Sequence, residues 1–190
     1  MLSSWNPSPS ELDSFAAEHV EYEVRMLLQQ YEHLETRWAE VEAANRHDLG
    51  SDGQALLEAV VVHLRLLDDF LGDWKQARRP VSRWRHRRRR VFDSVYARHW
   101  DVRWKPTSVL SKKQRKRANA MVAHLSGKRP ALGHWQPNEL LDPVLKCCVL
   151  LDVFFDRVAK VSPKRFSAFR PAPERDAPQR VKDFLREKGH

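Results

Sequence analysis

The chain has 190 residues, of which 42% are hydrophobic and 31% are charged, and its formal net charge is +9. This length and apolar fraction suffice for one domain with a single core and short appendages. No apolar run approaches the roughly 20 residues that span a bilayer, and the N-terminus lacks the basic and apolar regions of a secretory signal, so we expect a cytoplasmic protein without membrane association.

The N-terminal part of the chain predicts two long helices. Residues 1–10 are rich in Ser and Pro, and we expect them to form an extended arm. A helix is predicted over Glu11–Asn45, with Ser10 as its N-cap, because apolar residues recur there at intervals of three and four. A second helix is predicted over Gln54–Leu71, with an inward stripe of Leu56, Ala59, Val60, His63, Leu66, Leu67 and Phe70.

Residues 73–108 have no clean hydrophobic period. Tryptophans alternate with arginines, and Arg83–Arg90 reads RWRHRRRR, the most basic window of the chain. We expect Trp84, Trp100 and Trp104 either to pack in the core or to stack on nucleic-acid bases.

Two further helices and a tail follow. A third helix is predicted from near Val109 or Ser111 to Leu125, and a fourth over 143–160. The fourth is apolar on nearly all sides, so we expect it to be buried. Residues 161–190 are expected to form a tail with a short amphipathic helix over 179–188. We therefore predict an all-α antiparallel four-helix bundle over residues 11–160, with residues 73–108 as a long basic connection between helices 2 and 3.

The charge of the chain is sorted by segment. Residues 1–74 carry a net charge of −11, residues 75–129 of +17 and residues 130–190 of +3. Nucleic acid is the natural partner for the middle segment, because neutralising phosphates releases condensed counterions. Alternatively, the acidic first helix neutralises the basic connection within the chain. The nucleic-acid-binding candidates are Arg83, Arg85, Arg87, Arg88, Arg89, Arg90, Lys112, Lys113, Arg115 and Lys116.

Two helical motifs carry a resemblance to a known family. The motif of the second helix comprises His63, Arg65, Leu67, Asp69 and Phe70, and that of the third comprises Asn119, Ala123, His124 and Leu125. Over about residues 15–160 the chain resembles a family of bacterial and mobile-element proteins of unassigned function. The pattern is similar to that of HEPN (higher eukaryotes and prokaryotes nucleotide-binding) four-helix domains, whose signature is Arg, four to six residues, then His.

The resemblance implies a metal-independent endoribonuclease, or an RNA-binding relative without catalysis, that acts as a toxin or phage-defence effector. Active members of the family form their site where two protomers meet, so a homodimer is implied. No cofactor is implied. In such a site His124 would transfer protons, Arg117 would hold the phosphate and Asn119 would orient it. Arg117 lies seven residues before His124, the longest gap in the family pattern, and Asn119 occupies the commoner arginine position.

Other interpretations of these residues remain open. Arg117 and His124 would otherwise be a solvated arginine and a helix-packing histidine. His63 is expected either to orient a partner from the core or to lie beside His124, and Arg65 to pair with Asp69 one turn away. The histidines lack zinc-ligand spacing, so no metal is expected.

A different class of function is a non-catalytic helical module that binds nucleic acid or an acidic protein such as an antitoxin-like chain. A third is a structural bundle whose charges pair between subunits.

Overall fold

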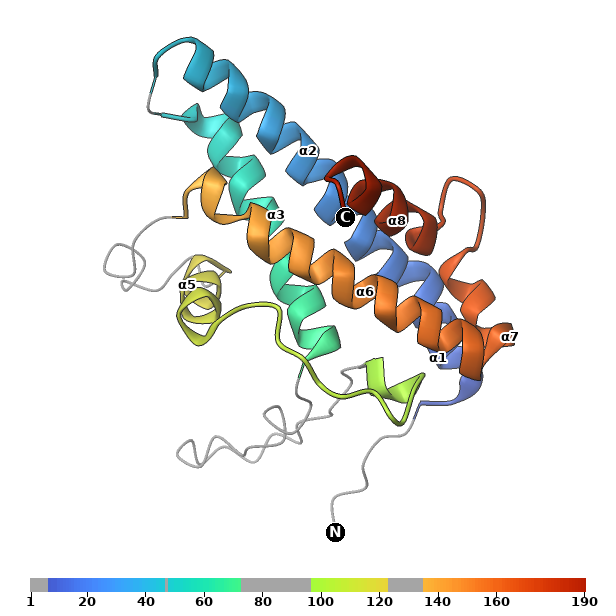
Figure 1. The fold of residues 1–190 in the computed structure, drawn as a ribbon. Coiled ribbons are helices and arrows are strands. Elements are labelled where there is room, and N and C mark those ends of the chain that lie inside the picture. The colour runs from blue at the N-terminus through green and yellow to red at the C-terminus, as the bar shows by residue number, and fades with distance from the viewer. Residues whose placement is uncertain (1–6, 47, 73–96, 123–134) are drawn as a thin grey trace, which may run out of the picture.

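The computed structural model describes residues 7–46, 48–72, 97–122 and 135–190, and these ranges are mostly helical (Figure 1). The predicted all-α class is confirmed: within those ranges there is no β-strand, and one isolated bridge joins Ala172 to Arg175. The elements are α1 (Pro9–Phe15), η1 (Ala16–Val20), α2 (Glu21–Ala43), α3 (Gly50–Leu71), η2 (Ala97–His99), α5 (Lys112–Val122), η4 (Pro137–Glu139), α6 (Leu141–Val161), α7 (Pro163–Phe166), η5 (Ser167–Phe169) and α8 (Ala177–Glu187).

The first helix is continuous from α1 through the π-helical η1 to the end of α2. It begins earlier than predicted, because Ser8 rather than Ser10 is the N-cap. The Ser8 hydroxyl accepts a hydrogen bond from the Glu11 amide at 3.2 Å, and the Glu11 carboxylate accepts one from the Ser8 amide at 2.7 Å. This reciprocal capping box satisfies two amides that would otherwise lack partners, and it fixes the start of the helix.

The inward face of α3 is broader than the predicted stripe. Leu66, placed on that stripe by the sequence pattern, is 47% exposed. Helices α2, α5 and α6 all contact α3, so a single stripe does not describe its buried surface. Buried residues outside the predicted stripe are Gly53, Leu57, Val61, Leu64, Asp68 and Leu71.

Helix α6 is buried on one side only. Its inward residues Leu151, Phe154 and Phe155 are at most 1% exposed, whereas Val149 and Val153 are 42% and 46% exposed. The expectation of a helix buried on nearly all sides is therefore wrong. The main helices packed against it, α3 and α8, leave a solvent face on which two valines lie.

Aromatic side chains from distant segments meet around Phe154. The rings of Phe70, Trp100, Trp104 and Phe169 have centroids 5.2 to 6.3 Å from that of Phe154. The Trp104 indole N–H donates to the Leu71 carbonyl at 3.0 Å, which satisfies its one polar group inside the core. Trp100 and Trp104 are thus core residues, and base stacking by these two is excluded in this structure. Trp84 lies outside the described residues.

The C-terminal segment belongs to the core. Helix α8 lies on α6 and α2 (Figure 1), and its predicted apolar face of Val181, Phe184 and Leu185 is buried. Its N-cap is Asp176, whose carboxylate accepts a hydrogen bond from the Gln179 amide at 3.0 Å. Residues 161–190 therefore form part of the domain rather than a tail appended to it.

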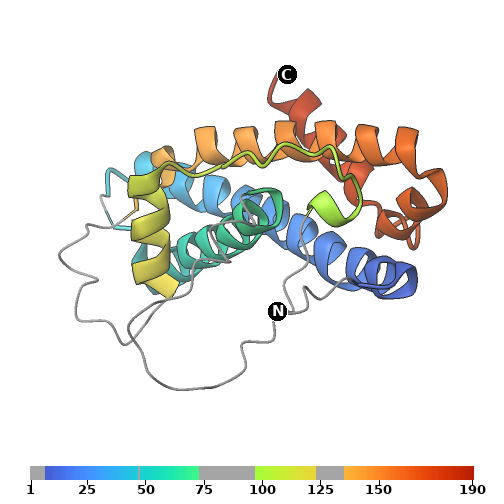
Figure 2. The same cartoon turned by 90° about the horizontal axis from the view of Figure 1, so that it is seen from below.

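Helix α5 differs most from the predicted arrangement. In Figure 2 the axis of α5 is transverse to that of α6 rather than alongside it, and α5 packs on α3. The antiparallel four-helix bundle expected from the sequence therefore does not describe α5. Helices α2, α3, α6 and α8 surround the core, and α5 lies on the outside of this group.

Candidate nucleic-acid interface

Helix α5 carries the described part of the predicted basic site. Its first turn is capped reciprocally: the Ser111 hydroxyl accepts from the Gln114 amide at 3.2 Å, and the Gln114 side chain accepts from the Ser111 amide at 2.9 Å. Of its described side chains, Ala118 and Met121 belong to the core cluster, at 0% and 5% exposure. Polar contacts therefore contribute much of what holds this helix in place.

Three cations of the first two turns, Lys112, Lys113 and Lys116, are exposed. We call these three residues the lysine face of α5. As far as the described residues go, none of the three forms an ion pair with a carboxylate. All three residues are open to solvent, and Lys113 is near enough to Glu139 to contribute to the lowered pKa of that carboxyl.

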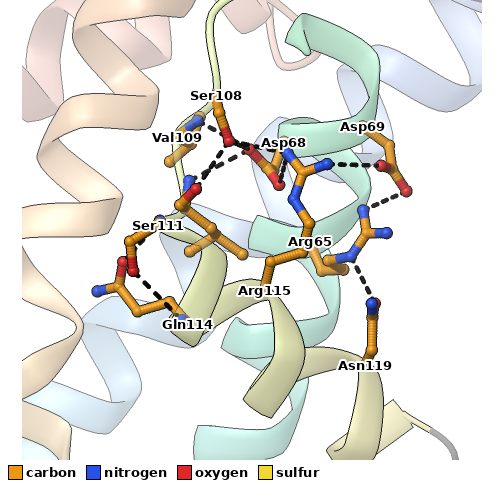
Figure 3. A network of polar contacts seen from close by, with 10 residues as sticks. Arg65, Asp68, Asp69, Ser108, Val109, Ser111, Gln114, Arg115 and Asn119 are labelled. Carbon is orange, nitrogen blue, oxygen red and sulfur yellow. Dashed lines mark hydrogen bonds and ion pairs between the residues drawn. The ribbon is translucent and has the colours of Figure 1, made fainter. Parts of the chain in front are cut away.

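Arg115, which the sequence placed with those lysines, points inward instead (Figure 3). Its Nη2 lies 2.6 Å from Oδ2 of Asp68 and donates to the Ser108 hydroxyl at 2.8 Å. Asp68 is fully buried in α3. Its charge is neutralised by that carboxylate, so Arg115 has a structural role in this contact, and the geometry gives no support to its predicted contact with phosphate.

The contact between α3 and the middle of α5 is also polar. Arg65 pairs with Asp69 one turn along α3, as predicted, and its Nε donates to the side-chain oxygen of Asn119 at 2.8 Å (Figure 3). Asn119 therefore joins two helices. The contact uses the carbonyl oxygen of Asn119 and does not involve its amide N–H groups, the donors that a phosphate would need.

The side chain of Arg117 extends from α5 in a different direction, toward Glu139 and Trp135. Its guanidinium donates two hydrogen bonds to the Glu139 carboxylate, at 2.9 and 3.1 Å, and lies 4.7 Å from the centroid of the Trp135 ring. The hydrogen bonds from Arg117 lower the pKa of Glu139 below its usual range. Residues two apart diverge by roughly 200° around a helix, so Arg117 and Asn119 do not converge on one substrate atom.

His63 contacts the first helix. Its Nδ1 lies 2.6 Å from Oε2 of Glu23 on α2, and its ring meets that of Tyr22 edge-on, with centroids 6.0 Å apart. The contact resembles the predicted orienting role, with a glutamate of α2 as the partner. The predicted alternative, a place beside His124, is not tested, because His124 lies outside the described residues.

Several predicted site residues fall in ranges on which the structure gives no description. These are His124 and the arginine run, namely Arg83, Arg85, Arg87, Arg88, Arg89 and Arg90. The predicted catalytic arrangement of Arg117, Asn119 and His124 therefore stays a prediction. Two of its members, Arg117 and Asn119, are each engaged by another side chain of the protein.

Glutamates of the acidic first helix form ion pairs with cations of the described residues. Buried Glu21 lies 3.5 Å from Arg25 and 3.3 Å from Arg175, and Glu35 pairs with Lys188 at 2.7 Å. Two of these partners come from the C-terminal segment. Part of the negative charge of residues 1–74 is therefore balanced by residues after 161, and not by the lysine face.

Sequence reasoning missed Asp68 and Glu139, the two carboxylates that turn the arginines of α5 inward. Asp68 interrupts the apolar run LRLLDDFL, where a charged residue on the buried side needs a partner. Glu139 ends a Gln136-Pro-Asn-Glu139 capping box. Both signals are local, and neither identifies the arginine that each acid binds.

Other chemistry finds little support in the described ranges. There, no group of His, Cys, Asp and Glu has the arrangement of a metal site. Cys147 and Cys148 are buried free thiols, and burial raises the pKa of Cys148 to about 12, so neither is a nucleophile near neutral pH. Among the helices of the described ranges, none is both long and apolar enough to traverse a bilayer.

Comparison with protein-family models, with curated proteins and with solved structures gives no match for this chain.

Proposed function

We propose that this protein is a non-catalytic helical module that binds RNA through phosphate contacts. The observation that carries the proposal is the sorting of cations on α5. Its arginines, Arg115 and Arg117, are paired with carboxylates of the fold, whereas the lysine face is exposed and forms no ion pair with a carboxylate in the part of the chain that the structure describes. The segment that contains α5, residues 75–129, also carries a net charge of +17. Such an excess favours a polyanion.

The expected mode of binding is contact with the backbone rather than with bases. Lysine ammonium groups act as point charges on phosphates and carry little sequence information. Trp100, Trp104 and Trp135 are buried, so none of them offers a stacking surface. We therefore expect weak sequence preference and strong dependence on salt. RNA is the polyanion to test first, because the helical motifs resemble those of HEPN domains.

Binding without cleavage is favoured by the engagement of Arg117 with Glu139. A phosphate held by Arg117 would have to displace a bidentate carboxylate. The contrary outcome is simple to detect: RNA cut by the wild-type protein without metal, but left intact by His124→Ala, would establish a nuclease. A homodimer and an antitoxin-like partner stay predictions.

The test is equilibrium binding of a labelled mixed-sequence RNA, followed by fluorescence anisotropy. The Lys112→Ala/Lys113→Ala/Lys116→Ala variant removes the lysine face. Its matched control, Lys105→Ala/Lys160→Ala/Lys164→Ala, removes three exposed lysines elsewhere, so the net charge is the same. We expect affinity to fall about tenfold or more in the first and much less in the second. Equal losses in the two variants, or no binding by the wild type, would overturn the proposal.

A further inference from the structure

We propose that Asp68 is a positioning residue for RNA binding: from inside α3 it fixes the start and the rotation of α5, and so directs the lysine face outward. This inference rests on the proposed function. Asp68 itself is 0% exposed and touches no ligand, so any effect on binding must pass through α5.

The contacts of Asp68 converge on the entry to α5 (Figure 3). One carboxylate oxygen, Oδ1, accepts hydrogen bonds from the amides of Val109 at 2.8 Å and Leu110 at 3.2 Å, and from the Ser108 hydroxyl at 3.1 Å. The other, Oδ2, lies 2.6 Å from Nη2 of Arg115. A buried carboxylate requires this degree of satisfaction, and here every partner lies in or just before α5.

These contacts act on two different features of the helix, its starting point and its rotation. The amides of Val109 and Leu110 precede the capping residue Ser111, so their bonds fix the point at which the chain enters α5. Arg115 lies one turn into the helix, so its ion pair fixes the rotation of the helix about its own axis. At about 100° per residue, an inward Arg115 places Lys113 about 160° away, on the outer side.

The apolar contacts of α5 leave room for such a role. Only Ala118 and Met121 of its described side chains belong to the core cluster, and both lie in the second half of the helix. The first half, which holds the lysine face, is attached to α3 through Arg115 and Asp68. Loss of that ion pair should therefore release the basic half of the helix before the apolar half.

A matched carboxylate separates positioning from stability. Glu21 at the start of α2 is also 0% exposed and also lies between two arginines, Arg25 and Arg175. Figures 1 and 2 both place the start of α2 away from α5. Asp68→Asn and Glu21→Gln each remove one buried negative charge. On charge alone, both should raise RNA affinity slightly.

The experiment measures RNA affinity and thermal unfolding for Asp68→Asn, Arg115→Lys, the double variant and Glu21→Gln, beside the lysine-face triple variant. We expect Asp68→Asn and Arg115→Lys each to lower affinity about fivefold to tenfold, although neither removes a positive charge. The double variant should lose no more RNA affinity than whichever single variant loses more, because both changes break the same contact between Asp68 and Arg115. Glu21→Gln should bind within twofold of the wild type despite its lower melting temperature.

The outcomes separate the inference from the function on which it rests. If the lysine-face variant weakens binding but Asp68→Asn and Arg115→Lys bind as Glu21→Gln does, the positioning role of Asp68 is wrong and RNA binding by α5 stands. If the wild type does not bind RNA, the proposed function itself fails. Should Asp68→Asn not fold, Arg115→Lys carries the test, because the Arg115 side chain is 22% exposed and its charge is retained.

Discussion

Arg175 Nε lies 3.3 Å from Oε2 of Glu21, although 154 residues separate the two in the sequence. The same guanidinium donates to the carbonyl of Ala17, in the π-helical turn that precedes α2. The connection between η5 and α8 is thereby attached to the first helix, so a segment near the C-terminus stabilises one near the N-terminus.

Removal of Arg175 should therefore destabilise the whole fold. Arg175→Ala leaves the buried Glu21 carboxylate with Arg25 alone, and we expect a loss of about 2 kcal/mol in the free energy of unfolding. This figure is lower than for a fully buried pair, because Arg175 is 42% exposed and water screens it. Urea unfolding measures the loss. Arg186→Ala, whose side chain is 74% exposed, is the control and should change stability by less than about 0.5 kcal/mol. Equal losses in the two would mean that the Glu21 contact contributes nothing.

The C-terminal helix is expected to contribute as much as an internal core element. Phe184 is 3% exposed and packs edge-on against Tyr31 of α2, with ring centroids 5.9 Å apart. Phe184→Ala should cost about 3 kcal/mol in the free energy of unfolding. Val153→Ala, on the exposed side of α6, should cost less than about 0.5 kcal/mol. A loss as small as that of Val153→Ala would mean that residues 161–190 contribute little to the stability of the domain and behave as a tail.

Replacement of Trp104 should separate stability from RNA binding. In Trp104→Phe the Leu71 carbonyl loses its indole donor, which should lower the free energy of unfolding by about 1 kcal/mol or slightly more. RNA affinity should stay within twofold of the wild type, because a ring in the core cannot stack on a base. Anisotropy titration of the folded variant tests this. A large loss of affinity without loss of stability would assign Trp104 to the interface.

The pair formed by Arg117 and Glu139 should contribute a pH-dependent part of stability. The bond from Arg117 lowers the folded-state pKa of Glu139, so this contribution is present above the unfolded-state value and is lost as pH falls through the folded-state value. The stability gap between wild type and Arg117→Gln should therefore be larger at about pH 6 than at about pH 3. Glu139 is partly exposed, so the change is small. If the difference in free energy of unfolding between wild type and Arg117→Gln is the same at both pH values, Arg117 stabilises the fold only through its contact with Trp135 and not through Glu139.

The sequence predicted the helices well, because the periodicity that defines each helix is local. Helix 143–160 was observed as Leu141–Val161, and 179–188 as Ala177–Glu187. The faces of the helices were predicted less well. Leu66 was placed inward because the pattern of α3 allows more than one stripe, and the helices that cover it come from distant parts of the chain.

The candidate site shows the same limit more clearly. In sequence, Arg115 and Arg117 are equivalent to the lysines beside them, and all five cations of α5 appear as one basic surface. Only the fold brings Asp68 to one arginine and Glu139 to the other. Long-range pairs of this kind are not encoded in residue spacing, so the sequence could indicate a basic helix but not which of its cations face water.

The most direct test of RNA binding by α5 is the salt dependence of its affinity. Each phosphate contact on a single strand contributes about 0.7 to the slope of log K against log salt concentration. Removal of the lysine face, Lys112, Lys113 and Lys116, should therefore reduce the magnitude of the slope by about 2, whereas the Lys105, Lys160 and Lys164 control should leave it nearly unchanged. The same slope for the wild type and the lysine-face variant would contradict the account.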